Sequence, residues 1–341
     1  MKEYKVFYGY RKKYIFGILL FPIALILKFI PKKNIILYGS MNGFDIVDNS
    51  KYKFINEYNS NSYFITKNIA LLDKEILQNV KPIYSHSFKG ILLQCIAKKV
   101  YFTHSIHDFV APLVWGAKKC NLWHGVPIKN IDPETYFKLQ KNIVVKFKKM
   151  IYKLFPYLYD VCCDEVYTPY KELVPIYESA FKLCGPIVKV KQQPRIKYAK
   201  KNTKTNRILY APTYRKNKDI NHVVHENGLL DKKLGQLLKQ KNLKIVLRVH
   251  PIDATNLNKN MLSDHIILDN SGDLYESITS YCAVVSDFSS VYTDAESLQI
   301  PTYFLCNDYE EYKEEWGLYE YADIKIRENQ NKKMIKIIEQ L

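Results

Sequence analysis

A histidine near the middle of the chain stands in a pattern suited to acid–base chemistry. The segment 121–129 reads NLWHGVPIK and closes a short apolar stretch. The pKa of an ordinary histidine lies near neutral pH, so His124 is a candidate general base. Gly125 permits a tight turn or close approach of a ligand, Pro127 fixes the backbone beyond it, and Lys129 adds a cation. A lone loop histidine is also often structural, so position alone leaves both interpretations open.

Cations gather where two later apolar segments end. Residues 207–210 run into Ala-Pro-Thr-Tyr-Arg, and the apolar segment 244–249 is followed by His-Pro. Arginine offers paired donors that match phosphate oxygens, so these positions predict a site for a phosphate or diphosphate. The competing interpretation is that they are surface cations in a chain rich in them. The residues of the predicted site are Pro212, Thr213, Arg215, Arg248 and His250.

A third segment, 284–295, reads VVSDFSSVYTDA and predicts a strand, a turn and a helix. Asp287, Ser289 and Ser290 fall at the expected start of the helix, where side-chain oxygens cap the first turn and free N–H groups point outward. A helix start of this kind favours anions. Capping accounts for one serine readily and for two less well.

Familiar nucleotide and metal signatures are absent from the sequence. It contains no G-x-x-x-x-G-K-[ST] loop, no G-x-G-x-x-G fingerprint and no D-x-D pair. His104 and His107 have only Asp108 beside them, which does not favour a metal site. These absences favour phosphate handling by protein cations and a helix start, with no metal ion and no cofactor.

The chain that carries these segments alternates short apolar runs with longer stretches suited to helices, which is typical of an α/β protein. Ligands of such folds bind beyond the carboxyl ends of the strands, where the candidate residues fall. The alternation restarts in the second half, which predicts two Rossmann-like domains facing a cleft. The predicted strands are 34–38, 62–66, 99–103, 120–123, 165–168, 181–184, 207–210, 244–249, 265–268, 282–286 and 302–305.

The predicted organisation has three parts. An apolar and basic segment covers residues 1–33, an N-terminal domain 34–190 and a C-terminal domain 191–341. The stretch 187–207 is basic with no acidic residue, so it predicts a solvated connector at the boundary.

Length and charge limit the class of protein. The chain has 341 residues, 47% of them hydrophobic, which excludes a mainly disordered protein. Seven cysteines without a C-x-x-C pair indicate reduced thiols. The net charge of +17 predicts an anionic partner such as nucleic acid, a membrane surface or a phosphorylated substrate. Most of that excess lies in residues 1–33 and 187–207.

The N-terminal apolar run, 14–27, is flanked by Lys and Arg on both sides. As a helix it reaches about 21 Å, short of the ~30 Å core of a bilayer. No small-residue cleavage site follows it, so a secretory signal is not favoured. It predicts either a segment lying on the anionic cytoplasmic leaflet or a helix packed on the first domain. The basic amphipathic stretch 138–153 is a second candidate for lipid contact or a plain solvated helix face.

Taken in order, the segments resemble the CDP-glycerol glycerophosphotransferase family of teichoic-acid primases and polymerases and their capsule relatives, over about residues 34–320. The family's Trp-His-Gly-Thr-Pro-Leu-Lys is similar to 123–129, its Tyr-Ala-Pro-Thr to 210–213 and its Thr-Asp-Tyr-Ser-Ser to 286–290. The remaining matches are Ser40, Gly43, Asp48-Asn49, Lys51-Tyr52, His250-Pro251, Asp308, Tyr312 and Gly317-x-Tyr319.

Two departures accompany the resemblance. The family follows its mid-chain glycine with Pro-Arg-Asn-Asp, whereas Gly185-Pro186 runs here into Ile-Val-Lys. The family arginine is therefore missing there, and Lys189 or Arg195 is a candidate to replace it. A late Arg-Gly of the family is Trp316-Gly317 here.

The resemblance implies a glycosyltransferase-B fold and transfer of glycerol phosphate from CDP-glycerol to a hydroxyl of a lipid-linked or polymeric acceptor, with release of CMP. His124 is then the expected base. His250, Arg215, Arg248, Ser289 and Ser290 are expected to neutralise the diphosphate, at the cytoplasmic face of the membrane.

Three alternatives stay open at this point. One is transfer of ribitol phosphate or a sugar on the same fold. Another is a basic nucleic-acid-binding protein, although no binding motif or aromatic stacking signature accompanies the charge, so nucleic acid is not an expected partner. The third is a catalytically silent scaffold, against which the intact His124, His250 and Ser289-Ser290 speak.

Overall fold

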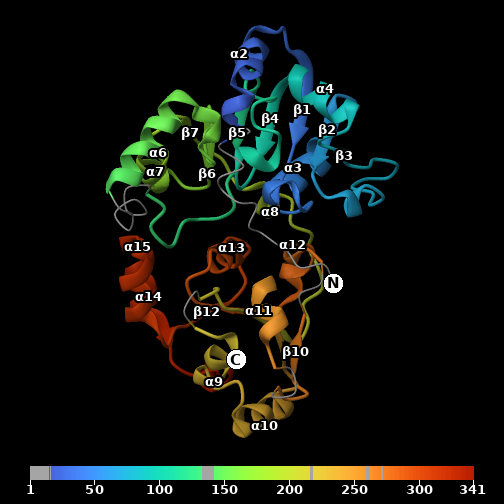
Figure 1. The fold of residues 1–341 in the computed structure, drawn as a ribbon. Helices are drawn as coiled ribbons and strands as arrows, with labels where there is room; N and C mark the ends of the chain where they lie inside the picture. The colour runs from blue at the N-terminus through green and yellow to red at the C-terminus, as the bar shows by residue number, and fades with distance from the viewer. Residues whose placement is uncertain (1–14, 16, 133–141, 216–217, 259–261, 270–271) are drawn as a thin grey trace. The chain divides into compact units, whose positions relative to one another are not determined.

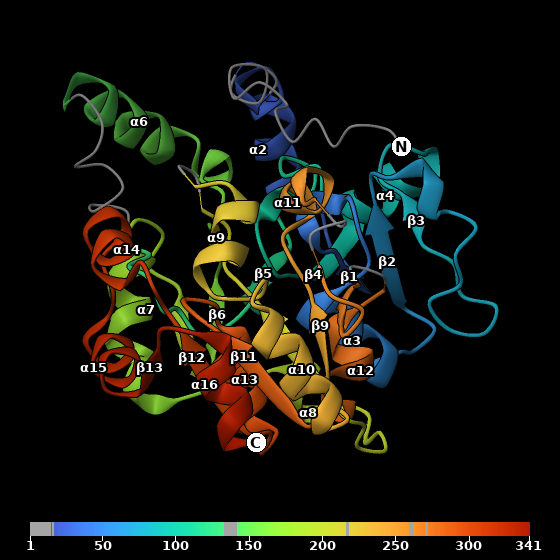
Figure 2. The same cartoon turned by 90° about the horizontal axis from the view of Figure 1, so that it is seen from below.

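The computed structural model describes residues 15, 17–132, 142–215, 218–258, 262–269 and 272–341. The chain divides into two compact units (Figures 1 and 2). Unit 1 comprises residues 1–124 and 131–198, and unit 2 comprises 125–130 and 199–341. Each unit is built on its own parallel sheet, which confirms the predicted α/β class with two Rossmann-like halves.

Unit 1 has a seven-stranded sheet in the order β3-β2-β1-β4-β5-β6-β7, with every neighbouring pair parallel. Its strands are β1 (Lys33–Tyr38), β2 (Ser62–Thr66), β3 (Ile83–Tyr84), β4 (Ala97–Phe102), β5 (Lys118–Asn121), β6 (Glu165–Thr168) and β7 (Ile187–Val190). Its helices are α2 (Phe21–Phe29), α3 (Asp48–Glu57), α4 (Phe88–Ile96), α6 (Asn142–Leu154), α7 (Val174–Ala180) and α8 (Pro194–Lys197). Parallel alignment brings the carboxyl ends of these strands to one edge of the sheet.

Unit 2 has a six-stranded parallel sheet in the order β10-β9-β8-β11-β12-β13. Its strands are β8 (Arg207–Ala211), β9 (Lys244–Leu247), β10 (Ile266–Leu268), β11 (Ala283–Ser286), β12 (Thr302–Leu305) and β13 (Gln330–Asn331). Its helices are α9 (Ile220–Glu226), α10 (Lys232–Gln240), α11 (Pro251–Asn256), α12 (Leu274–Ser277), α13 (Val291–Ser297), α14 (Tyr309–Trp316), α15 (Glu320–Asn329) and α16 (Met334–Gln340). Aliphatic side chains of the central strands fill its core, among them Ile208, Ile245, Leu247 and Val285.

Aromatic rings fill the core beside α3 in unit 1. Phe54 is fully buried and meets Tyr38 at 5.2 Å and Phe64 at 5.6 Å between ring centroids, both edge to face. Tyr38 in turn stacks on Tyr101 of the neighbouring strand. This packing fixes α3 against β1, β2 and β4, and α3 begins at the candidate site.

Most predicted strands are confirmed, but 181–184 is wrong. Phe181 closes α7 instead, because its N–H donates to the Tyr177 carbonyl at 2.9 Å, and Gly185 then turns with φ 58°. The strand of this region is β7, which lies inside the predicted connector 187–207. There Lys189 pairs with Glu165 of the adjacent strand at 2.6 Å. This pairing explains how a lysine-rich stretch forms a strand at the edge of the sheet. The two-residue strands β3 and β13 were not predicted.

The domain boundary differs from the prediction in two ways. The helix α8 packs against α3, so unit 1 continues past residue 190 to Tyr198. Residues 125–130 belong to unit 2, although the predicted N-terminal domain included them. The chain therefore leaves unit 1 directly after His124 and returns at Ile131.

The helix α2 buries one face and exposes the other. Ala24 and Leu27 are buried, while Phe21 meets Phe155 edge to face at 4.9 Å between ring centroids. Packing on the first domain is thus confirmed for one face of the N-terminal segment. None of the helices in the described ranges has the length and apolar character needed to cross a bilayer. The amphipathic stretch is helical as α6 from Asn142 onward, and 138–141 lies outside the described residues.

The buried ring of Phe54 offers a test of the unit 1 core. Phe54→Ala should lower the free energy of unfolding by about 3–5 kcal/mol, because it removes buried apolar surface and leaves a cavity. Phe88→Ala is the matched control, since Phe88 on α4 is 86% exposed and its loss should change the free energy by less than about 0.5 kcal/mol. Urea denaturation followed by circular dichroism measures both, and equal effects would contradict the described packing.

Candidate active site

His124 is held at the carboxyl edge of the unit 1 sheet by a sharp turn after β5. Asn121 at the strand end accepts a hydrogen bond on Oδ1 from the Trp123 N–H at 2.9 Å. Trp123 adopts φ 55°, the left-handed region that non-glycine residues rarely occupy, and Asn49 donates to its carbonyl at 2.8 Å. These bonds fix a strained backbone, which leaves the His124 side chain half-buried at the strand end.

The hydrogen bond of His124 defines its tautomer. Its Nδ1 lies 3.2 Å from the carbonyl oxygen of Thr103. A carbonyl can only accept, so Nδ1 carries the proton and Nε2 keeps its lone pair. Burial, followed by the neighbouring charge of His104, lowers the pKa of His124 to about 3. The ring is therefore neutral near pH 7 and its Nε2 is available to accept a proton.

A buried ion pair lies next to this histidine. Arg195 of α8 donates from Nη1 to Asp48 Oδ1 at 2.7 Å, and both side chains are buried. Burial alone would raise the pKa of Asp48, but the charge of Arg195 outweighs it together with His104 and His124, and the pKa stays below its ordinary value. Of the two candidates for the missing family arginine, Arg195 pairs with Asp48 beside His124, and its replacement of that arginine stays a prediction. Lys189 pairs with Glu165 on the sheet.

In unit 2 the central feature is Arg215, which follows β8. Its Nε donates to Asp308 at 2.7 Å, its Nη2 to Asp287 at 2.9 Å and its Nη1 to the Thr213 carbonyl at 2.6 Å. The guanidinium lies 4.9 Å from the ring centroid of Phe288 and 4.7 Å from that of Tyr312. Burial opposes the charge, but Asp287 and Asp308 together raise the pKa of Arg215.

These contacts change the expected role of Arg215. One guanidinium faces two carboxylates, so these three side chains together carry a formal negative charge. That charge disfavours the binding of a diphosphate at this point. Arg215 instead ties together the loops that follow β8, β11 and β12. Its direct contact with a diphosphate stays a prediction, whereas its positioning contacts are present in the structure.

Asp287 does not cap α13 as the sequence predicted. Its carboxylate accepts from the Thr213 N–H at 2.9 Å and from the Thr213 hydroxyl at 2.5 Å. The N-cap of α13 is Ser290, whose side chain makes no capping bond, while Ser289 Oγ accepts from the Val291 N–H at 3.3 Å. Asp287 therefore joins two strand-end loops, and the roles of the two serines toward a ligand stay predictions.

Arg248 and His250 lie in the loop after β9, at the same edge of the unit 2 sheet as Thr213. The Arg248 N–H donates to the Tyr210 carbonyl at 2.9 Å, and its side chain donates to the Gly272 carbonyl. The His250 ring lies 5.2 Å from the Tyr214 ring between centroids, and burial lowers the pKa of His250. Both residues are thus placed by their neighbours at a strand-end edge.

The second half of the His124 segment is held by unit 2. The Tyr319 N–H donates to the Ile128 carbonyl at 3.0 Å, and Lys129 Nζ lies 4.7 Å from the Trp316 ring centroid. Burial, followed by Arg215, lowers the pKa of Lys129. Gly125, with φ 145°, occupies a backbone region that favours glycine. Pro212 lies between β8 and Thr213.

The sequence predicted His124 and the cations at the strand ends as site residues. It did not predict which side chains contact them. Asp48, Arg195 and His104 are separate positions in the sequence. In the structure all three lie beside His124. The available signal was that His104 directly follows the predicted strand 99–103, as His124 follows the predicted strand 120–123. In the described ranges no three His, Cys, Asp or Glu side chains form a group able to hold a metal ion.

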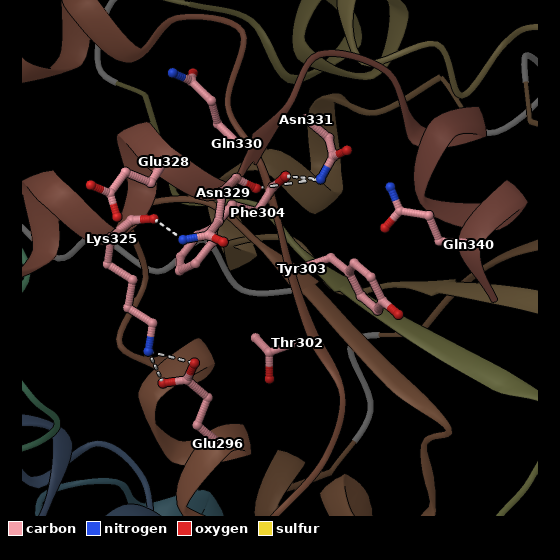
Figure 3. A pocket seen from close by; sticks show the side chains of 10 residues that line it. All are labelled: Glu296, Thr302, Tyr303, Phe304, Lys325, Glu328, Asn329, Gln330, Asn331 and Gln340. Carbon is pink, nitrogen blue, oxygen red and sulfur yellow. Dashed lines mark hydrogen bonds and ion pairs between the residues drawn. The ribbon is translucent and has the colours of Figure 1, made fainter.

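A pocket of about 460 Å³ lies elsewhere in unit 2, beside the edge strand β13 (Figure 3). Most of its lining side chains are polar, and among them Lys325 pairs with Glu296 at 2.6 Å. None of the predicted site residues borders it. Its lining is Glu296, Thr302, Tyr303, Phe304, Lys325, Glu328, Asn329, Gln330, Asn331 and Gln340.

Two units, each built on its own parallel sheet with helices around it, define an α/β protein of the two-domain glycosyltransferase-B fold class. Residues 19–327 match the family described as CDP-glycerol:poly(glycerophosphate) glycerophosphotransferase, so the chain belongs to that family and is a transferase.

Relatives and solved structures agree with this family. The chain is 30% identical over 129 residues to the teichoic acid ribitol-phosphate primase of Bacillus spizizenii, an alignment covering 37% of this chain and 31% of that protein. It is 24% identical to the teichoic acid glycerol-phosphate primase of Bacillus subtilis, over 78% of this chain and 70% of that protein. The fold is similar to that of the wall teichoic acid polymerase TagF in a variant soaked with CDPG, at 16% identity and a TM-score of 0.69 over 99% of this chain and 88% of that one.

The Arg215 cluster makes a stability prediction. Arg215→Met leaves the buried Asp287 and the largely buried Asp308 without this cation, so it should lower the free energy of unfolding by about 3–5 kcal/mol. Lys325→Met is the matched control, because the exposed Lys325–Glu296 pair contributes less than about 1 kcal/mol. Urea denaturation measures both variants. An Arg215→Met protein as stable as the control would show that the cluster does not organise unit 2.

Proposed function

We propose that the protein transfers glycerol phosphate from CDP-glycerol to a hydroxyl of a membrane-linked or growing cell-surface polymer, teichoic acid or capsule, and releases CMP. The observation that carries this proposal is the His124 tautomer. A neutral imidazole with a free Nε2 stands at a strand end in a chain of the glycerophosphotransferase family. The TagF structure soaked with CDPG supports the choice of donor.

The reaction follows from these groups. The acceptor hydroxyl attacks the β-phosphorus of CDP-glycerol, and His124 Nε2 takes the hydroxyl proton. The new O–P bond forms while the bond from the β-phosphorus to the oxygen shared with the α-phosphate breaks, and that oxygen leaves on CMP. His250, Arg248, Ser289 and Ser290 stabilise the developing charge, with Arg215 and Asp287 positioning their loops. Phosphoryl transfer depends chiefly on such positioning and charge stabilisation.

The base can be tested directly. His124→Asn keeps a polar side chain of similar size but lacks a proton acceptor of suitable basicity, so CMP release from CDP-glycerol should fall by about 10²–10⁴-fold. His222→Asn is the matched control, because His222 is exposed on α9 of unit 2. Release is followed by chromatography of CMP with a lipid-linked acceptor. Undiminished release by His124→Asn would remove His124 from the mechanism.

A second donor is favoured by a specific observation. The chain is similar to both a ribitol-phosphate and a glycerol-phosphate primase, so ribitol phosphate is the alternative transferred group. Parallel assays with CDP-glycerol, CDP-ribitol and nucleotide sugars, each read by nucleotide release, separate these donors. Product mass then distinguishes a single addition from polymer growth.

We place the protein at the cytoplasmic face of the cell membrane as a peripheral protein. The outward face of α2 carries exposed apolar side chains, with Phe29 81% and Ile26 63% exposed, and Phe147 and Met150 of α6 are exposed as well. Exposed lysines accompany them, namely Lys28, Lys33, Lys146, Lys149 and Lys153. Apolar insertion combined with basic charge suits an anionic leaflet, where a lipid-linked acceptor would lie.

Vesicle binding tests this location. The double variant Ile26→Asp, Phe29→Asp should bind phosphatidylglycerol vesicles about tenfold more weakly than the parent, because it places charges on the inserting face. Ile324→Asp, on α15 of unit 2, should bind as the parent does. Cosedimentation at two salt concentrations measures the change. Equal binding of both variants, or equal binding of the parent to phosphatidylcholine vesicles, would contradict the proposed contact.

A further inference from the structure

Two histidine rings lie face to face in unit 1. The rings of His104 and His124 are 4.5 Å apart between centroids and inclined by only 7°. His104 follows β4 and His124 follows β5, so neighbouring strands deliver the two rings to the same edge of the sheet. Trp123 also contacts His124, with 4.4 Å between ring centroids.

Thr103 holds both rings at once. Its carbonyl oxygen is 3.2 Å from His124 Nδ1, and its hydroxyl is 2.8 Å from His104 Nδ1. One residue therefore fixes the orientation of both imidazoles relative to the same strand end. A ring held on its Nδ1 side and stacked on one face has little freedom to rotate, so the direction of the His124 Nε2 lone pair depends on His104.

The charged groups around the two rings come from three other elements. Asp48 at the start of α3 faces both rings, and Arg195 of α8 pairs with Asp48 at 2.7 Å. Asp108, which accepts from the Thr103 N–H at 3.3 Å, is the next carboxyl, and burial raises its pKa to about 7. The negative charge of Asp48 is thus largely matched by Arg195, and the pair of histidines lies in a nearly neutral environment.

We propose that His104 is a positioning residue for His124, holding its ring in place and taking the first proton that enters the pair, so that His124 stays neutral as the base. This inference rests on the proposed function in one respect, the assignment of His124 as base. The stacking geometry and the shared Thr103 contact carry it.

The electrostatics support an order of protonation. Burial lowers the pKa of His104, but Asp48 raises it again as the second contribution. For His124 the charge of His104 is the second contribution after burial and lowers its pKa further, ahead of Asp48, which raises it. Two parallel imidazolium rings at this separation repel, so the second proton enters only at lower pH. His104 accordingly protects the base form of His124 on the acid side.

The variant His104→Phe keeps a stacked ring and removes the titratable group. The C2–H resonance of His124, assigned by its loss in His124→Asn, should titrate about one to two pH units higher in this variant than in the parent. The acid limb of kcat/KM for CMP release should move up by the same amount, since a base with a raised pKa is protonated at higher pH. Above pH 8 the rate should stay within about threefold of the parent.

Matched variants separate positioning from general damage. In His104→Ala the acid limb of kcat/KM should move up as it does in His104→Phe. This variant should also lose about tenfold in kcat at high pH, because it removes the ring that stacks on His124. His104→Gln, which keeps a polar partner for the Thr103 hydroxyl, provides a second variant without the ring charge should the phenylalanine variant not fold. His222→Phe, on the exposed face of α9, should leave both the titration and the rate profile unchanged.

The outcome decides the inference even if the proposed reaction is wrong. An unchanged His124 titration in folded His104→Phe or His104→Gln would overturn it, whatever the activity. A shifted titration in a protein that releases no CMP from any CDP-polyol would uphold the coupling of the two histidines and refute the proposed function instead. A shifted titration with an unmoved acid limb would overturn the role of the pair in catalysis.

Discussion

The ion pair between Asp48 and Arg195 is the contact on which the unit 1 site depends. A buried pair costs free energy of desolvation and is weak evidence for stability by itself. Here it fixes geometry: Asp48 begins α3 with φ 64°, its neighbour Asn49 holds the Trp123 carbonyl, and Asn49 Oδ1 accepts from the Arg195 N–H at 3.1 Å. The aromatic core fixes α3, and through Asn49 it therefore also fixes the turn at Trp123 and His124.

Unit 2 uses an arginine–aspartate cluster in a comparable way, but with two carboxylates for one guanidinium where unit 1 has one. Asp287 and Asp308 outnumber Arg215, and Lys218, which pairs with Glu226 at 2.7 Å, adds to the local positive charge near Asp308. The buried Arg215 holds together the loops that carry the two carboxylates, and its contact with an anion stays a prediction. The predicted contacts of a diphosphate with His250 and Arg248, which lie in the loop after β9, stay predictions.

The sequence predicted the parallel α/β class and several strands to the residue, including 62–66, 165–168 and 302–305, because short apolar runs between polar stretches are strong local signals. It failed where the deciding contact is distant. The apolar run at Phe181 has the sequence of a strand, but its N–H bonds to Tyr177 at the end of a helix. The lysine-rich stretch that contains β7 was not predicted as a strand, because the pairing of Lys189 with Glu165 on the next strand is not visible in the sequence. Likewise, the positive charge of Arg215 marked it as a candidate in the sequence. Its contacts with Asp287 and Asp308 are visible only in the structure.

The signature segment around His124 is shared between the two units of the chain. Trp123 and His124 are fixed by Asn121, Asn49 and Thr103 in unit 1, whereas Ile128 and Lys129 are fixed by residues of α14 and the loop after it in unit 2. Gly125 directly follows His124, and its φ of 145° is one that a side chain would strain. Glycine at this position therefore meets a backbone requirement one peptide bond after His124. The segment 123–129 therefore meets two structural requirements, because Trp123 and His124 are held within unit 1 and Ile128 and Lys129 within unit 2.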